Sequence, residues 1–176
     1  MISYFRKRKP YITRLFPNNY IDIHSHLLPN IDDGSKSLEE STVLIKRLVS
    51  YGINNFVVTP HIMDGVWNNT PEVINNKLFE LTNYLKTQEI QGVKIRAAAE
   101  YMIDTNFEKL LNKKELLTIK DNFILIELSY FNPPINLKEI LFNIQIAGYQ
   151  PILAHPERYN FYHSNYNEYF KLKELG

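Results

Sequence analysis

The sequence contains no cysteine among its 176 residues. This absence excludes a disulfide-stapled scaffold, thiolate ligands for a metal ion and a cysteine nucleophile. A metal site in this chain would therefore depend on nitrogen and oxygen donors from histidine, aspartate and glutamate.

The sequence also lacks a strong net charge and a long apolar run. A formal net charge of +1 gives no extended field for nucleic acid or for a membrane surface. No stretch approaches the roughly 20 apolar residues of a membrane span. Pro10, Arg14 and Pro17 interrupt the apolar region that a signal peptide needs. We therefore expect a cytoplasmic protein with no transmembrane segment and no nucleic-acid partner.

Residues 1–19 form a basic N-terminal arm that contains the run Arg6-Lys7-Arg8-Lys9. We interpret the arm as a solvated, frayed terminus. The alternative is a weak attraction to an acidic membrane surface or an acidic partner. Residues 20–176 are numerous enough for one domain with its own core.

Apolar runs and helical patterns alternate along residues 20–176. Strands are predicted at Tyr20–Ile23, Ile53–Thr59, Val93–Ala99, Phe123–Ile126 and Gln150–Ala154. Helices are predicted from the Ser37-x-x-Glu40 capping box to Gly52, from Thr70 to about Gln88, over Asn106–Leu111 and Leu137–Ala147, and late in the segment after Phe161. Five strand-helix units in succession predict a parallel sheet with right-handed crossovers.

The first predicted strand runs into the motif Asp22-Ile23-His24-Ser25-His26. Side chains two apart on an extended chain point to the same side, so His24 and His26 face the same way. Two neutral imidazoles held together are most simply used to bind one cation. The motif therefore predicts a metal site.

The other predicted strands also end in polar residues, in the order His61, Glu100, Glu127 and His155. The carboxyl ends of parallel strands meet on one side of an α/β fold, where its functional groups gather. Histidine and carboxylate together suit Mn, Fe, Zn or Mg. Asp32 and Asp33 add carboxylates just beyond the histidine pair.

Each of these residues has an ordinary alternative. A single histidine after a strand is commonly a satisfied core or cap residue, Glu127 could pair with a lysine, and Asp32-Asp33-Gly34 could be a simple turn. The coincidence at five successive strands favours metal binding. His163 lies outside the pattern, and we expect it at the surface.

Arg158 follows His155 by three residues, which would place a guanidinium beside the metals. Its fork of donors matches phosphate, and the alternative is a salt bridge to Glu157. Trp67, in the loop after His61, could flank a phenyl ring, although we favour packing.

Together these motifs resemble the PHP (polymerase and histidinol phosphatase) superfamily, and within it the CpsB/CapC/YwqE-like group of bacterial capsule and exopolysaccharide protein-tyrosine phosphatases. The resemblance is carried, in family order, by the segments Asp22–Gly34, Thr59–His61, Ala99–Tyr101, Leu125–Ser129 and Ile152–Tyr159.

The resemblance implies a distorted TIM-like (β/α)7 barrel with up to three metal ions, usually Mn²⁺. It implies that His24 and His26 hold one ion, that Glu100 bridges two, that Glu127 and His155 complete the second, and that Asp33 and His61 belong to the third. It gives Arg158 the role of binding phosphate.

The chain departs from this family at its end. Members carry a late Ser-Asp-x-His motif whose Asp and His complete the metal sphere, and no such motif occurs here. The spacing of the predicted strands puts the end of a sixth near or beyond Gly176. We therefore expect residues 20–176 to form a C-terminally incomplete domain that lacks its last βα units: a truncated chain, one part of a split protein, or one completed by a partner.

The function implied is hydrolysis of phosphotyrosine in proteins, with the tail of a membrane tyrosine kinase that controls polysaccharide export as the substrate. Two alternatives remain. One is a small-molecule phosphoesterase of the histidinol-phosphate type, and the other is an inactive module that binds the tail. An oligomer is possible, but the sequence does not specify it.

Overall fold

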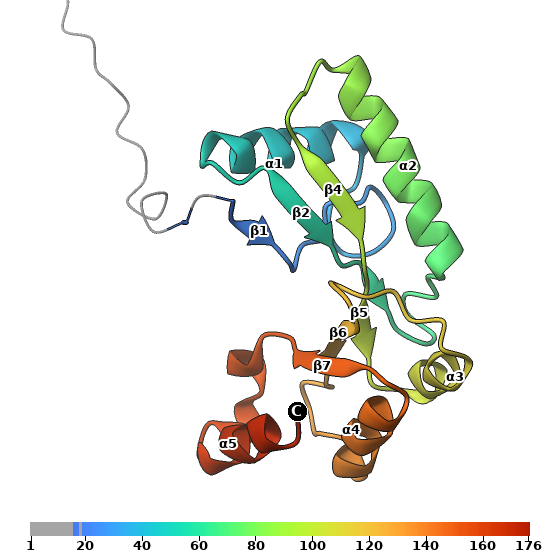
Figure 1. The fold of residues 1–176 in the computed structure, drawn as a ribbon, viewed down its shortest axis with the longest axis vertical. Helices are drawn as coiled ribbons and strands as arrows, with labels where there is room; N and C mark the ends of the chain where they lie inside the picture. Colours follow the sequence, from blue (N-terminus) through green and yellow to red (C-terminus); the bar gives the residue numbers. More distant parts are fainter. Residues whose placement is uncertain (1–15, 18) are drawn as a thin grey trace, which may run out of the picture.

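The computed structural model describes residues 16–17 and 19–176 (Figure 1). The basic run Arg6–Lys9 lies outside the described residues. All strand pairs are parallel, as predicted, in one sheet of order β1-β2-β4 and another of order β3-β5-β6-β7. The strands are β1 Ile21–Asp22, β2 Asn55–Val58, β3 His61–Ile62, β4 Lys94–Ala97, β5 Glu100–Met102, β6 Phe123–Glu127 and β7 Gln150–Leu153.

Two short strands, β3 and β5, lie beyond the ends of the predicted second and third strands and were not predicted. β2 and β3 are separated by Thr59-Pro60, and β4 and β5 are separated by Ala98-Ala99. The two neighbouring segments stay in register between the strands, because the Ala98 amide donates to the Val58 carbonyl and the Glu100 amide donates to the Pro60 carbonyl. His61 and Glu100 follow β2 and β4, as predicted, and are the first residues of β3 and β5.

The helices follow their sequence signals closely. They are α1 Leu38–Ser50, α2 Pro71–Thr87, α3 Thr105–Lys113, α4 Leu137–Ile146 and α5 Asn167–Glu174. Ser37 caps α1 by accepting from the Glu40 amide, and Thr70 caps α2, whose first residue is Pro71. Gly52 takes a φ of +96° just after α1, as expected for a glycine that ends a helix.

The large core lies between these helices and the strands, as Figure 1 shows for α1 and α2 beside β2 and β4. A second, small apolar cluster contains Val57, Ala98, Ile119, Leu125 and Ala154. Leu125 pairs in register with Glu100 and shares its face of β6 with Glu127. The small cluster therefore adjoins the same face of the sheet as the two buried glutamates.

The edge strands are β1 and β4 in one sheet and β3 and β7 in the other, and each pairs with one neighbour among the described residues. Within that same part of the chain, no helix is long and apolar enough to cross a membrane.

Candidate metal centre

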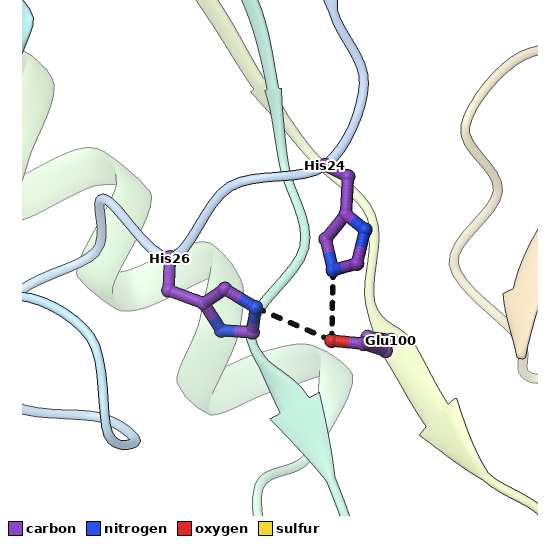
Figure 2. Close-up of side chains that lie close together, drawn as sticks. All are labelled: His24, His26 and Glu100. Atoms are coloured by element: carbon purple, nitrogen blue, oxygen red, sulfur yellow. Dashed lines mark hydrogen bonds and ion pairs between the residues drawn. The ribbon is translucent and has the colours of Figure 1, made fainter. Parts of the chain in front are cut away.

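The histidine pair lies in an extended segment directly after β1. Between the two histidines, the Ser25 amide donates to Thr59 Oγ1 at 3.2 Å, and its carbonyl accepts from the Thr59 amide at 2.8 Å. These bonds tie the pair to the end of β2. Both imidazoles point to the same side, as the H-x-H spacing predicted, and their rings lie 5.6 Å apart (Figure 2).

Glu100 is the centre of the cluster. Its fully buried carboxylate faces four imidazoles. The distances from its oxygens are 3.0 Å to His24 Nε2, 3.2 Å to His26 Nε2, 3.4 Å to His61 Nδ1 and 2.8 Å to His155 Nε2. Figure 2 shows His24 and His26 converging on one of these oxygens.

Glu127 is the second buried carboxylate. Its Oε1 lies 2.7 Å from His61 Nδ1, and its Oε2 lies 3.7 Å from His155 Nε2. Although they are close, His61 Nδ1 and Glu127 Oε1 do not have hydrogen-bond geometry, and both atoms are buried without a hydrogen-bond partner among the described residues. Buried polar atoms of this kind call for another partner, such as a cation.

Asp33 is the outlying carboxylate. Its side chain is 67% exposed and lies 3.6 Å from His61 Nε2. With His26 and His61 it forms one of three overlapping sets whose potential ligand atoms lie within 4.8 Å of one another. The other sets are His24, His26 and Glu100, and His61, Glu100 and Glu127.

The donor set fits divalent cations. Nitrogen and oxygen ligands about 2.1 Å from one ion lie roughly 3.0–3.4 Å apart at octahedral or tetrahedral angles. The separations of Glu100 from His24, His26 and His61 fall in this range. Because the three sets share members, ions held by them would be bridged by common ligands.

In the cluster, hydrogen bonds between histidines and carboxylates counteract the effect of burial on their pKa values. Burial disfavours a charged His26, but hydrogen bonds to Asp32 and Glu100 outweigh it and raise the His26 pKa to about 10. Burial would likewise raise the pKa of Glu100, but hydrogen bonds from His155, His24 and His26 hold it well below its ordinary value. The carboxylate is therefore ionised and available to a cation.

His155 lies just after β7 in a strained backbone conformation. Its φ of +29° is in the region that non-glycine residues rarely adopt. The turn Pro156–Arg158 follows, and the Arg158 amide donates to the His155 carbonyl at 2.9 Å. This turn places the His155 ring on Glu100 and the Arg158 side chain in the wall of the same pocket.

The remaining predictions have different outcomes. Arg158 pairs with no carboxylate of the described residues; its Nη1 donates to the Tyr130 hydroxyl, a contact that the sequence analysis missed. His163 is exposed, as expected. Trp67 is half-buried, its backbone bridges to Met63, and it does not line the pocket. Glu127 faces histidines and not a lysine.

The comparisons with known proteins point to one family. A sequence model described as capsular polysaccharide synthesis, CpsB/CapC, matches residues 20–176. The chain is 32% identical over 157 residues to the tyrosine-protein phosphatase YwqE of Bacillus subtilis, covering 89% of this chain and 61% of the relative. It is 34% identical over 162 residues to the tyrosine-protein phosphatase CpsB of Streptococcus pneumoniae, covering 89% of this chain and 64% of the relative.

A solved structure agrees. It comes from a crystallographic description of YwqE and CpsB as unique metal-dependent tyrosine phosphatases. It superposes on this chain with a TM-score of 0.82 at 31% identity, covering 89% of this chain and 64% of the other. The chain thus spans 61–64% of the length of these relatives.

Proposed function

The chain belongs to the CpsB/CapC family of capsular polysaccharide synthesis proteins, and on that basis we propose that it is a metal-dependent phosphatase acting on phosphotyrosine in proteins. One observation carries the proposal: four histidines and two buried glutamates converge on one another, beside an arginine that has no carboxylate partner among the described residues.

The proposed ligands are the residues of the cluster, which would hold up to three ions, with Mn²⁺ as the first choice and Fe, Zn or Mg as others. They are His24, His26, Asp33, His61, Glu100, Glu127 and His155. Glu100 contacts the most histidines and is the natural bridging ligand. Divalent cations bound there would supply the Lewis acidity that activates water and neutralises phosphate charge.

Arg158 is the proposed phosphate-binding residue. Its guanidinium offers paired donors that match two phosphate oxygens, and it lines the pocket together with the histidines. In the transition state these donors stabilise the charge on the equatorial oxygens. A tyrosinate leaving group has a pKa of about 10, so it departs with less acid assistance than an alkoxide would need.

The wider setting is proposed from the family. The substrate would be the tyrosine-containing tail of a membrane tyrosine kinase that controls capsule or exopolysaccharide synthesis, dephosphorylated in the cytoplasm. The strands follow one another in parallel order, which supports the proposal that they form part of the wall of a distorted (β/α)7 barrel. Further βα units, or a second copy of the chain, would close the gap between β7 and β1.

The test is phosphate release by the metal-loaded protein from a phosphotyrosine peptide and from histidinol phosphate, measured side by side. We expect release from the peptide and preference for it. Preference for histidinol phosphate would replace the proposal with a small-molecule phosphoesterase. Tight peptide binding without release in Mn²⁺ would indicate a binding module, consistent with a chain that spans only part of its relatives.

A further inference from the structure

The two neighbouring aspartates of the Asp32-Asp33-Gly34 turn differ sharply in their surroundings. The Asp33 side chain is 67% exposed, whereas that of Asp32 is fully buried. A buried carboxylate is costly unless it is paired and hydrogen-bonded. Asp32 belongs to none of the three sets of potential metal ligands, so its burial needs another explanation.

Three donors converge on Asp32. Its Oδ2 lies 2.7 Å from His26 Nδ1 and accepts from the His61 amide at 3.0 Å. Its Oδ1 accepts from the Gly34 amide at 2.9 Å. The carboxylate is therefore satisfied on both oxygens, and it joins the loop that carries His26 to the start of the strand that carries His61.

The bond to His26 fixes the use of that ring. A carboxylate can only accept, so Nδ1 must carry the proton that it donates to Asp32. The other nitrogen, Nε2, lies 3.2 Å from Glu100 and is therefore the one that can give up its proton and offer its lone pair to a cation. The arrangement is that of a carboxylate–histidine pair whose outer nitrogen faces a metal.

We propose that Asp32 is a positioning residue for the metal centre: it keeps Nδ1 of His26 protonated, so that Nε2 is the nitrogen offered to a cation, and it holds His61 in register through the backbone. This inference rests on the proposed metal centre, because without bound ions the orientation of His26 has no chemical consequence.

Substitution of Asp32 by asparagine should break this arrangement at constant volume. If the amide oxygen faces His26 and His61, the NH2 group opposes the Gly34 N–H; if the amide is turned round, the NH2 group opposes the His61 N–H and forces His26 to present Nδ1 as an acceptor. In the second orientation the proton moves to Nε2, which can then no longer bind a cation. Either orientation places donor against donor.

The experiment measures metal affinity by competition with a chelating dye, for Mn²⁺ and for Zn²⁺, in the parent chain and in Asp32→Asn and Asp32→Ala. We expect affinity to fall about 10- to 100-fold in both variants. The control is Glu157→Gln, which removes a carboxylate that lines the same pocket without contacting His26; it should keep the parent affinity. Histidine side-chain ¹⁵N spectra of the zinc-loaded parent should show His26 ligated through Nε2 with Nδ1 protonated.

Two results would overturn the proposal. One is metal affinity within twofold of the parent in folded Asp32→Asn, and the other is an equal loss in Glu157→Gln, which would indicate a general charge effect. Circular dichroism of the metal-free proteins separates loss of metal from loss of fold. If the parent binds metal but releases no phosphate from any substrate, the proposed function fails while the role of Asp32 is still tested.

Discussion

The Tyr130 hydroxyl accepts a hydrogen bond from Arg158 Nη1 at 3.3 Å, at the rim of the candidate metal centre. This bond raises the pKa of Arg158 and keeps its guanidinium charged. The Tyr130 ring also lies 5.8 Å from the His155 ring and 6.2 Å from that of Tyr159. Tyr130 therefore fixes one donor of Arg158 and leaves the others for a ligand.

The first prediction concerns this contact. Tyr130→Phe removes the hydroxyl and keeps the ring, so Arg158 should lose its fixed orientation. We expect KM for phosphotyrosine peptide to rise about fivefold, corresponding to roughly 1 kcal/mol for one exposed hydrogen bond, with a smaller change in kcat. In an Arg158→Ala background the same substitution should have no further effect. An equal effect in both backgrounds would show that Tyr130 acts independently of Arg158.

The second prediction concerns Arg158 itself. Arg158→Ala should lower kcat/KM by roughly 10²–10³, because a donor to the transition-state oxygens is lost. Metal content should stay the same, since Arg158 is not a proposed ligand. Arg158→Lys keeps the charge without the planar fork and should recover only part of the activity. Steady-state kinetics together with elemental analysis provide the measurement, and an unchanged rate in Arg158→Ala would remove Arg158 from the chemistry.

The sequence predicted which residues come together at the candidate centre better than it predicted the local geometry there. The period of two puts His24 and His26 on one side, and parallel βα order brings distant strands together; both follow from the chain alone. Strands β3 and β5 were not predicted, because His61–Ile62 and Glu100–Met102 are too short to give a strand pattern, and only pairing in three dimensions shows that they form a sheet.

The burial of individual side chains is the other feature that the sequence could not predict. Asp32 and Asp33 are adjacent and chemically identical, yet one is buried between two histidine segments and the other faces solvent. Which of the two is buried depends on how the turn after His26 meets β3. Likewise the Tyr130–Arg158 contact joins two loops that no local pattern relates.

The third prediction concerns the buried tyrosine that supports Glu127. The Tyr159 hydroxyl accepts from the Leu128 amide at 3.0 Å, and both residues are fully buried. Tyr159→Phe leaves that N–H without a partner and should cost about 1–3 kcal/mol of unfolding free energy. Tyr162→Phe is the matched control, because its hydroxyl makes no hydrogen bond among the described residues. Urea denaturation of the metal-free proteins measures both; equal losses would contradict the assigned role of the Leu128 bond.

The fourth prediction concerns metal removal. Ions that bind the folded chain only should stabilise it by about 2.7 kcal/mol per site at 100 times the dissociation constant. For a domain of this size, EDTA should then lower the Tm by roughly 5–10 °C per site. Glu100→Gln removes the carboxylate that four histidines share, so its Tm should respond little to EDTA. Thermal melts with and without Mn²⁺ make the comparison, and an EDTA-insensitive parent would argue against a bound metal.

The last prediction concerns Gly34, which closes the turn behind His26. A Cβ at this position would overlap the carbonyl oxygen and Cβ of His26 and would approach Asp32 Oδ1 to 3.0 Å. Backbone cannot yield as a flexible side chain does, so Gly34→Ala should displace His26 and lower metal affinity at least tenfold. Gly65→Ala is the control: Gly65 has a φ of +73° with open space around it, so alanine there costs about 1–2 kcal/mol of backbone strain away from the centre. We expect Gly65→Ala to lose stability but keep metal affinity, and Gly34→Ala to lose affinity even where it remains folded. The same dye competition used for Asp32 measures both variants, and parent-like affinity in Gly34→Ala would show that the turn does not set the position of His26.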